Sequence, residues 1–325
     1  MTEFITLGEP LVVLASENQD ISLDVAEHFS KYLAGAELNV AIGLSRLGHK
    51  GIYLSKVGED SFGNFIIESV KKAEIETTYL TKDKNYSTGF YLKQKVSEGD
   101  PKVDYYRKNS AAANLSIAEL KALDLSGIKI AHLSGIFPAL SETSLKTFQA
   151  FNQKLNEADI LTIFDPNLRP VLWDNQEKMI RTINDLAKQS QIILPGINEG
   201  EILTGSFEPE KIADFYLEQS TLTKIVVVKL GADGAFVKLK NGEQYFVSGF
   251  KVAKVVDTVG AGDGFAVGLE SALLEGKTLK EAVKRACAVG ALAVQSSGDG
   301  EGYPTKEELK AFSRRCSHAK SRIIK

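Results

Sequence analysis

The sequence is poor in cysteine, in charge of one sign and in long apolar runs. Its 325 residues include 2 cysteines, Cys287 and Cys316, too few for a disulfide framework. Lysine and arginine number 39 against 42 acidic residues, giving a net charge of −3. No Lys/Arg stripe marks a nucleic-acid partner, and no apolar run approaches the roughly 20 residues that cross a bilayer. These absences predict a soluble protein that binds neither nucleic acid nor membrane.

The first fifteen residues predict a strand and no leader peptide. They lack a basic region before the apolar residues, and Glu3 and Glu9 interrupt the apolar pattern. We therefore expect a cytoplasmic protein. Hydrophobic residues make up 43% and charged residues 25%, which are ordinary globular values. A chain of this length can bury enough surface for one large domain or two modest ones.

Short apolar runs alternate with longer amphipathic segments along most of the chain. Strands are expected over residues 4–7, 51–56, 128–133, 160–164, 192–195, 225–230 and 235–240. Helices are expected over residues 36–47, 63–73, 141–156, 177–189, 198–203, 209–218, 262–275, 279–295 and 306–317. This spacing predicts βαβ crossovers, and hence an α/β fold with a mainly parallel, doubly wound sheet.

Three strand-like segments, residues 10–17, 88–97 and 102–107, break this alternation. Residues 98–101, Glu-Gly-Asp-Pro, are a turn sequence and join the last two segments as a β-hairpin. An antiparallel ribbon that leaves an α/β sheet would cover a partner subunit or an active site. An edge hairpin of the main sheet fits the pattern equally well.

The most specific motif is Asp-Thr-Val-Gly-Ala-Gly-Asp-Gly-Phe, residues 257–265. It follows a strand-like run over 251–256 and opens a helix. Gly260, Gly262 and Gly264 let the backbone approach a ligand, and the free N–H groups at the positive helix end form an anion hole. Asp263 within it fits a base that takes a proton from a hydroxyl beside a phosphoryl group. The alternative is an aspartate that only stabilises the helix N-terminus.

Two nucleotide-binding fingerprints are absent. Gly276-Lys277-Thr278 ends like a Walker A loop, but the position five residues before Gly276 is Ser271. Residues 260–265 do not form the Gly-x-Gly-x-x-Gly of dinucleotide-binding proteins either. A hydride-transfer function therefore loses its main support.

Near the N-terminus, residues 34–41 lead into a helix. Gly35, Glu37 and Asn39 at its start could contact several hydroxyls of a polyol. An ordinary capped helix would show the same residue types.

Together these segments resemble a known family. Residues 34–48, AGAELNVAIGLSRLG, and 257–268, DTVGAGDGFAVG, resemble the two motifs of the PfkB, or ribokinase-like, carbohydrate kinases. VGEDSFG at 57–63 and NEGE at 198–201 agree, and the resemblance extends over essentially the whole chain. It implies one domain over residues 1–325, a ribokinase-like three-layer sandwich. A small β-ribbon lid would be formed by about residues 10–34 and 87–111.

The resemblance also implies roles for single residues. Asp263 would be the catalytic base, with the backbone of Gly260, Ala261 and Gly262 as the anion hole. Asn198 and Glu201 would hold Mg²⁺ through water at the triphosphate of ATP. A strand-to-loop segment would lie against the nucleotide: Lys229, Leu230, Gly231, Ala232, Asp233 and Gly234. A plain β-turn would show the same residue types.

Some members of the family have a monovalent-cation site near residues that Asp257 and Thr258 resemble, and whether it exists here stays open. Lids of this kind often pair between subunits, so a homo-oligomer joined through the lid also stays open.

The sugar is indicated by Arg107, which follows two tyrosines, and by Arg169. Two arginines with a tyrosine suit a bidentate grip on a planar carboxylate, although each alone could be a surface charge or a structural salt bridge. With these residues the chain resembles the 2-keto-3-deoxygluconate kinase branch. That resemblance implies a substrate site of Gly35, Ala36, Glu37, Leu38, Asn39, Tyr91, Tyr105, Tyr106, Arg107, Arg169, Asp263 and Asp299. Asn167, Arg169 and residues 260–263 would also contact ATP, and Asp299 could equally be a turn residue.

The sequence therefore predicts an ATP- and Mg²⁺-dependent kinase that phosphorylates the terminal (C6) hydroxyl of 2-keto-3-deoxygluconate. Two alternatives stay open. One is a fructokinase- or ribokinase-type enzyme for a neutral sugar. The other is a sugar- or nucleotide-binding regulator that kept the fold and lost the chemistry. Preference for the gluco or the galacto epimer leaves no trace in the sequence.

Overall fold

The structure, a computed structural model, describes residues 2–252, 254–295, 302–312 and 314. Its main element is a nine-stranded sheet. In spatial order the strands are β13 (Gln244–Ser248), β12 (Gly234–Leu239), β11 (Ile225–Lys229), β10 (Ile192–Ile193), β9 (Leu161–Asp165), β8 (Ile130–Ser134), β1 (Phe4–Leu7), β4 (Gly51–Gly58) and β5 (Leu80–Asp83). The seven strands from β11 to β5 are parallel, and β12 and β13 continue the sheet antiparallel at one edge.

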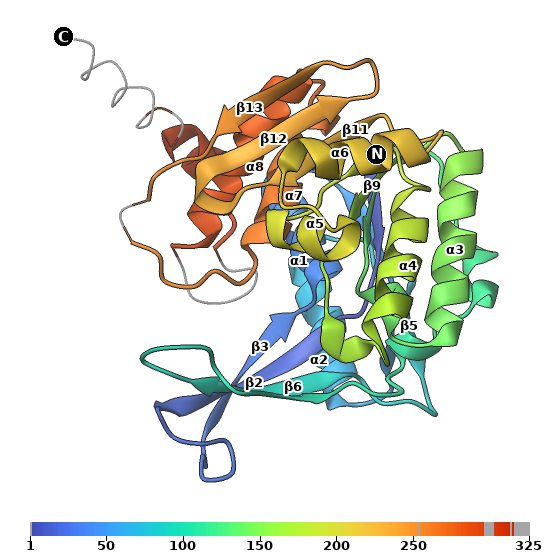
Figure 1. Ribbon diagram of the computed structural model, residues 1–325. Coiled ribbons are helices and arrows are strands. Elements are labelled where there is room, and N and C mark those ends of the chain that lie inside the picture. The colour runs from blue at the N-terminus through green and yellow to red at the C-terminus, as the bar shows by residue number, and fades with distance from the viewer. Residues whose placement is uncertain (1, 253, 296–301, 313, 315–325) are drawn as a thin grey trace.

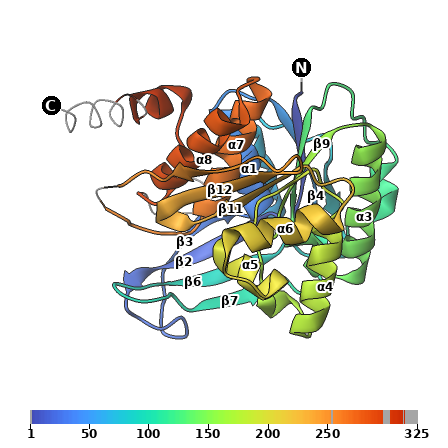
Figure 2. The same ribbon diagram turned by 45° about the horizontal axis from the view of Figure 1, so that its top comes forward.

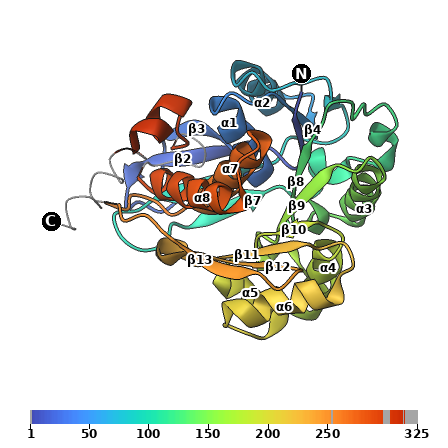
Figure 3. The same ribbon diagram turned by 90° about the horizontal axis from the view of Figure 1, so that it is seen from above.

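Helices cover both faces of this sheet, as the views from the front and from above show (Figures 1 and 3). One face carries α1 (Ala36–Arg46), α2 (Ser61–Lys72), α7 (Ala261–Leu274) and α8 (Leu279–Ala293). The other carries α3 (Glu142–Glu157), α4 (Gln176–Ala187), α5 (Ile197–Thr204) and α6 (Pro209–Gln219). Successive strand residues point to opposite faces, so the neighbours Phe4 and Ile5 belong to different cores. The predicted three-layer α/β architecture is confirmed.

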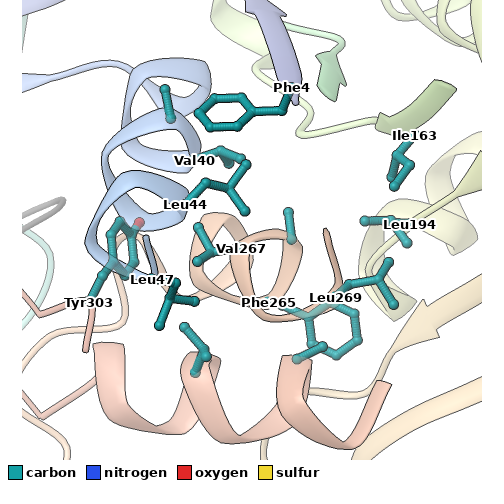
Figure 4. Close-up of a cluster of buried hydrophobic side chains, with 14 of the residues drawn as sticks. Phe4, Val40, Leu44, Leu47, Ile163, Leu194, Phe265, Val267, Leu269 and Tyr303 are labelled. Atoms are coloured by element: carbon teal, nitrogen blue, oxygen red, sulfur yellow. The ribbon is translucent and has the colours of Figure 1, made fainter. Parts of the chain in front are cut away.

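The core beneath α7 is the tightest part of this packing. Figure 4 shows Val267 of α7 facing Leu44 of α1, with Phe265 and Leu269 on the same helix. Burying a side chain of this size contributes roughly 1.5–3 kcal/mol to folding. Gly268 lets α8 approach, because a Cβ there would lie 2.6 Å from the Cα of Ala286. The helix that begins at the candidate anion hole is therefore fixed along its length.

A second, four-stranded sheet projects from the main body (Figures 1 and 2). Its order is β3 (Phe29–Ala34), β2 (Leu11–Gln19), β6 (Phe90–Lys95) and β7 (Val103–Tyr106). The hairpin expected from the turn sequence is present as β6–β7, in a register that pairs Tyr91 with Tyr105. The ribbon is thus a separate sheet and not an edge of the main one.

Asp60 fastens this second sheet to the core. It is the N-cap of α2, where its carboxylate accepts a hydrogen bond from the Gly63 N–H at 2.7 Å. The same carboxylate accepts from the N–H and the hydroxyl of Thr88, at 2.8 and 2.9 Å, just before β6. This double role gives the segment over residues 57–63 a structural purpose.

The other elements differ from expectation only at the weakest patterns. Strands β3, β5 and β13 carry many exposed polar residues and were not expected. The strand-like run over 251–256 was expected but forms no strand in its described residues, where Val255 and Val256 are exposed. The last expected helix is helical at 306–312 and 314, and its other residues lie outside the described ones.

The described residues also form five short 3₁₀ helices: η1 (Ala112–Asn114), η2 (Ile117–Leu120), η3 (Phe137–Ala139), η4 (Pro170–Leu172) and η5 (Gly231–Asp233). Within the part of the chain that the structure describes, no helix combines the length and apolarity needed to span a membrane.

We predict that Gly268→Ala lowers the free energy of unfolding by about 1–3 kcal/mol, because the added methyl forces α7 away from α8. Thermal and chemical denaturation would measure this loss. Lys284→Ala, on the exposed face of α8, is the control and should change stability little. Equal melting temperatures for Gly268→Ala and the wild type would contradict the packing argument.

Candidate active site

A cleft of about 430 Å³ lies where the carboxyl ends of the main-sheet strands meet the second sheet. Strands β1 and β8 are neighbours there, and the chain continues from them toward opposite edges of the sheet. Open α/β sheets bind ligands at such a switch point. The lining is Glu9, Leu11, Ala34, Gly35, Ala36, Glu37, Asn39, Tyr91, Tyr105, Arg107, Ile136, Asp165, Asn167, Arg169, Glu199, Lys229, Thr258, Val259, Gly260, Gly262 and Asp263.

Asp263 joins three elements at the centre of the cleft. It lies in the first turn of α7 and is 9% exposed. Asn39 of α1 donates from Nδ2 to its Oδ2 at 2.9 Å, and Asn167 after β9 donates to its Oδ1 at 3.2 Å. Burial raises the pKa of Asp263 to about 6. A carboxylate with this pKa can accept a proton near neutral pH, as a general base must.

The backbone before Asp263 forms the positive end of α7. Gly260, the N-cap, has φ 77°, a left-handed conformation that favours glycine. The hydroxyl of Tyr303 donates to the Gly260 carbonyl at 3.0 Å and fixes the turn. The N–H groups of Gly262 and Asp263 belong to the first turn, where a helix offers them no internal partner. They are placed to bind an anion.

Glu37 lines the same cleft from the first turn of α1. Gly35 before it has φ 130°, and a Cβ there would lie 2.6 Å from the Glu9 carbonyl oxygen. The Glu37 side chain is fully buried, and neither carboxylate oxygen has a hydrogen-bond partner among the described residues. Burial raises its pKa to about 7. Glu37 is thus an unpaired polar group facing the cleft.

Asp165 organises the loop that carries Asn167. Its Oδ2 accepts from Nζ of Lys229 at 2.6 Å, and its Oδ1 accepts from the Asn167 N–H at 3.2 Å. Asn167 has φ 40°, a conformation that asparagine tolerates better than most residues. Glu199 accepts from the Leu168 N–H at 2.8 Å, and burial raises the pKa of Glu199. These contacts place the Asn167 amide against the base.

The two arginines differ in their surroundings. Arg107 donates from Nε to Oε2 of Glu9 at 2.7 Å, and its Nη2 contacts the same oxygen. Arg169 donates from Nη1 to the Leu168 carbonyl at 2.9 Å and has no ion pair among the described residues. Both line the cleft, but one cation is already paired with a buried carboxylate.

The cleft brings together most of the residues expected at the substrate and the base: Gly35, Ala36, Glu37, Asn39, Tyr91, Tyr105, Arg107, Asn167, Arg169, Lys229, Gly260, Gly262 and Asp263. The sequence argument missed Glu9 and Glu199. In the sequence, Glu9 was visible only as an interruption of an apolar run. Glu199 belongs to the NEGE segment, in which only Asn198 and Glu201 were considered as ligands.

The remaining expected residues lie off the cleft lining. Leu38 is fully buried in the core, and Tyr106 is half exposed and stacks on Phe90 with ring centroids 4.8 Å apart. Asn198 and Glu201 are exposed on α5. Ala261 begins α7 behind the lining, and Leu230, Gly231, Ala232, Asp233 and Gly234 form the turn from β11 to β12. Asp299 lies outside the described residues.

Comparison with known proteins agrees with this geometry. The family model described as pfkB family carbohydrate kinase matches residues 2–306. A 2-dehydro-3-deoxygluconokinase of Bacillus subtilis (strain 168) is 45% identical over 320 residues, 97% of each chain.

Among solved structures, a PfkB protein from Polaromonas sp. JS666 is 42% identical, with a TM-score of 0.86 over 96% of this chain and 100% of that one. A candidate ribokinase II from E. coli, in complex with ATP and Mg²⁺, is 26% identical, with a TM-score of 0.87 over 97% and 100%.

The fold is that of a ribokinase-like α/β protein, and the candidate site lies at the switch point of its main sheet. The chain belongs to the pfkB family of carbohydrate kinases.

The buried Glu37 predicts a stability that depends on pH. Burial raises its pKa to about 7 from the usual 4.5, so the folded state holds this proton more tightly than the unfolded state. The resulting cost is absent below about pH 4.5, grows as pH rises, and is complete above about pH 7, where it is on the order of 3 kcal/mol. Glu37→Gln should therefore gain stability relative to the wild type between about pH 5 and pH 8.

Urea denaturation at about pH 5 and pH 8 measures the difference in unfolding free energy between Glu37→Gln and the wild type. Glu218→Gln, at an exposed position, is the control and should follow the wild type at both. A constant difference between Glu37→Gln and the wild type would contradict the burial argument.

Proposed function

We propose that this chain is an ATP-dependent kinase that transfers the γ-phosphoryl group to the C6 hydroxyl of 2-keto-3-deoxygluconate, giving the 6-phosphate. The observation that carries the proposal is one cleft holding a buried aspartate at a helix N-terminus together with two arginines. The similarity to a 2-dehydro-3-deoxygluconokinase, at 45% identity over 97% of each chain, supports this acceptor.

Asp263 is the proposed catalytic base. Its ionised carboxylate accepts the proton of the C6 hydroxyl as the oxygen attacks the γ-phosphorus in line and the bond to ADP breaks. The amides of Asn39 and Asn167 hold the two carboxylate oxygens at 2.9 and 3.2 Å, so the base is oriented before substrate arrives. The N–H groups of Gly262 and Asp263 would stabilise the negative charge on the transferred group. Of the anion hole expected over residues 260–262, the Ala261 N–H donates instead to the Thr258 carbonyl at 3.3 Å.

The nucleotide would lie along the turn from Lys229 to Gly234, with Asn167 and Arg169 near its phosphates. Asn198 and Glu201 offer the oxygen ligands that Mg²⁺ prefers, and their exposure on α5 leaves room for intervening water. Bound Mg²⁺ would neutralise phosphate charge. A monovalent-cation site near Asp257 and Thr258 stays a prediction, and Asp257 forms an ion pair with Lys93 at 3.5 Å.

The sugar would occupy the side of the cleft between α1 and the second sheet. Gly35, Glu37 and Asn39 face its hydroxyls, and Tyr91 and Tyr105 cover it from the lid. The carboxylate would lie toward Arg107 and Arg169. A planar guanidinium can bind a carboxylate through two parallel hydrogen bonds. A neutral sugar has no carboxylate and cannot be bound in this way.

The second sheet is the proposed lid of a single domain, spanning about residues 10–34 and 87–111. Closing over the cleft, it would exclude water that otherwise hydrolyses ATP. We place the enzyme in the cytoplasm, and pairing of lids between two subunits remains a prediction.

A kinase of a neutral sugar is the second candidate function. The observation in its favour is the pairing of Arg107 with Glu9, which cancels one of the two positive charges that an acid sugar would meet. The charge of Arg169 therefore distinguishes the two candidate functions, because a kinase of an acid sugar needs it and a kinase of a neutral sugar does not.

Asp263→Asn should abolish nearly all turnover while leaving ATP binding largely intact, since loss of a general base costs roughly 10²–10⁴-fold in rate. Because the base must be ionised, the kcat/KM of the wild type should fall as pH drops through about 6. Steady-state kinetics and nucleotide titration measure both effects. Substantial turnover by Asp263→Asn would refute the role of this residue.

A coupled ATP-consumption assay with 2-keto-3-deoxygluconate, fructose and ribose tests the substrate. We expect the highest kcat/KM with the acid sugar, and Arg169→Ala should raise the KM for it at least tenfold, as expected when a charged hydrogen bond is lost. The KM for a neutral sugar should change far less. A wild type that prefers fructose or ribose would favour the second candidate function.

A further inference from the structure

Glu9 lies where the chain passes from the main sheet to the second sheet. It follows β1 and precedes β2, and its side chain is 0% exposed. Its partner Arg107 follows β7, the last strand of the second sheet. Their ion pair thus connects the segment before β2 with the segment after β7 at the wall of the cleft.

The carboxylate of Glu9 is fully engaged. Oε2 accepts from Nε of Arg107 at 2.7 Å and is also contacted by Nη2. Oε1 accepts the hydroxyl hydrogen of Ser110. A Cβ at Gly89 would lie 2.8 Å from Oε1, so no larger residue fits beside it. Glu9 is therefore held in one orientation from three directions.

This arrangement fixes the guanidinium plane of Arg107. A guanidinium presents two edges that can each bind a carboxylate with parallel N–H groups. Glu9 occupies the edge formed by Nε and Nη2, and the ring of Tyr105 lies 5.7 Å from Cζ. The remaining edge, Nη1 and the second hydrogen of Nη2, has no partner among the described residues, while Arg107 lines the cleft.

We propose that Glu9 is the positioning residue of the sugar-acid site: it holds Arg107 so that the free edge of the guanidinium meets the substrate carboxylate. This inference rests on the proposed function, since it assumes an acid sugar. Glu9 needs no contact with the sugar. Its contribution is to spare Arg107 the loss of side-chain freedom that binding would otherwise cost.

A positioning role and a purely electrostatic role of Glu9 predict opposite changes in sugar-acid binding for the substitution Glu9→Gln. Glu9→Gln removes a negative charge from the cleft wall, so a purely electrostatic role would strengthen binding of an anionic sugar. A positioning role predicts weaker binding, because the neutral amide holds the guanidinium less strongly. The direction of the change in KM therefore decides between the two roles.

We expect Glu9→Gln to raise the KM for 2-keto-3-deoxygluconate about tenfold, the scale of a weakened charged hydrogen bond. The kcat and the KM for ATP should stay near the wild-type values, because Glu9 has no contact with Asp263 or the α7 N-terminus. Glu9→Asp, which restores the charge, should recover part of the loss. An unchanged or lowered KM for the sugar acid in Glu9→Gln would overturn the proposal.

A double-mutant cycle tests whether Glu9 acts through Arg107. Arg107→Ala alone should raise the KM for the sugar acid, and adding Glu9→Gln to it should have no further effect. Effects that multiply in the double variant would mean that Glu9 acts independently, and would also overturn the proposal. Calorimetric titration of the sugar acid without ATP gives the same cycle as binding constants.

Glu119→Gln is the matched control. Glu119 accepts a hydrogen bond from the Ser116 hydroxyl at 2.6 Å and pairs with Lys56, so it has a serine and a cation as partners like Glu9, but it lies off the cleft lining and its side chain is 22% exposed. Glu119→Gln should leave the KM for the sugar acid unchanged. The wild type separates the two hypotheses: no binding or turnover of any sugar acid refutes the proposed function, whereas normal turnover with an additive cycle refutes only the role of Glu9.

Discussion

The structure depends on the contact between Asp263 and the amides of Asn39 and Asn167. Asn39 and Asp263 are 224 positions apart in the sequence, one on a helix near the N-terminus and the other on a helix near the C-terminus. Both helices cover the same face of the sheet, and the core between them, from Leu44 to Val267, fixes their relative position. The raised pKa of Asp263 follows from the same packing, because burial penalises its charge and the hydrogen bond from the Asn39 amide only partly offsets this cost.

The fold was largely predictable because its signals are local. The buried parallel strands are continuous apolar runs, and the helices carry their apolar residues at a helical period, so most elements matched within a few residues. Strands β3, β5 and β13 escaped because they are half exposed and lie at sheet edges, where polar residues hide the pattern. The run over 251–256 failed for the opposite reason. It contains three β-branched valines, but it also contains two lysines, and Val255 and Val256 are exposed.

The site was predictable only where the chemistry leaves a sequence signature. A glycine-rich turn before a helix shows itself in residue types, so Asp263 and Gly260 could be found. Glu9 and Glu199 carry no such mark, because a buried carboxylate is recognised by the groups that it meets in the folded chain. Glu9 meets Arg107, and Glu199 meets the Leu168 N–H as well as the nearby Gly196 N–H. Lys229 was expected at the nucleotide, and its ion pair with Asp165 was not foreseen. Pairings of this kind require the tertiary structure.

These buried carboxylates explain how a chain of net charge −3 can bury the cations that line the proposed substrate cleft. Glu9 holds Arg107 and Asp165 holds Lys229, so each cation costs less to bury than it would alone. The pairing removes most of the long-range field, and what remains is directional: the free edge of a guanidinium and the N–H groups of a helix end. A cleft of this design discriminates ligands by the geometry of their acidic oxygens more than by their charge. The proposed function needs this discrimination, because ATP and an acid sugar are both anions and would bind in different halves of the cleft.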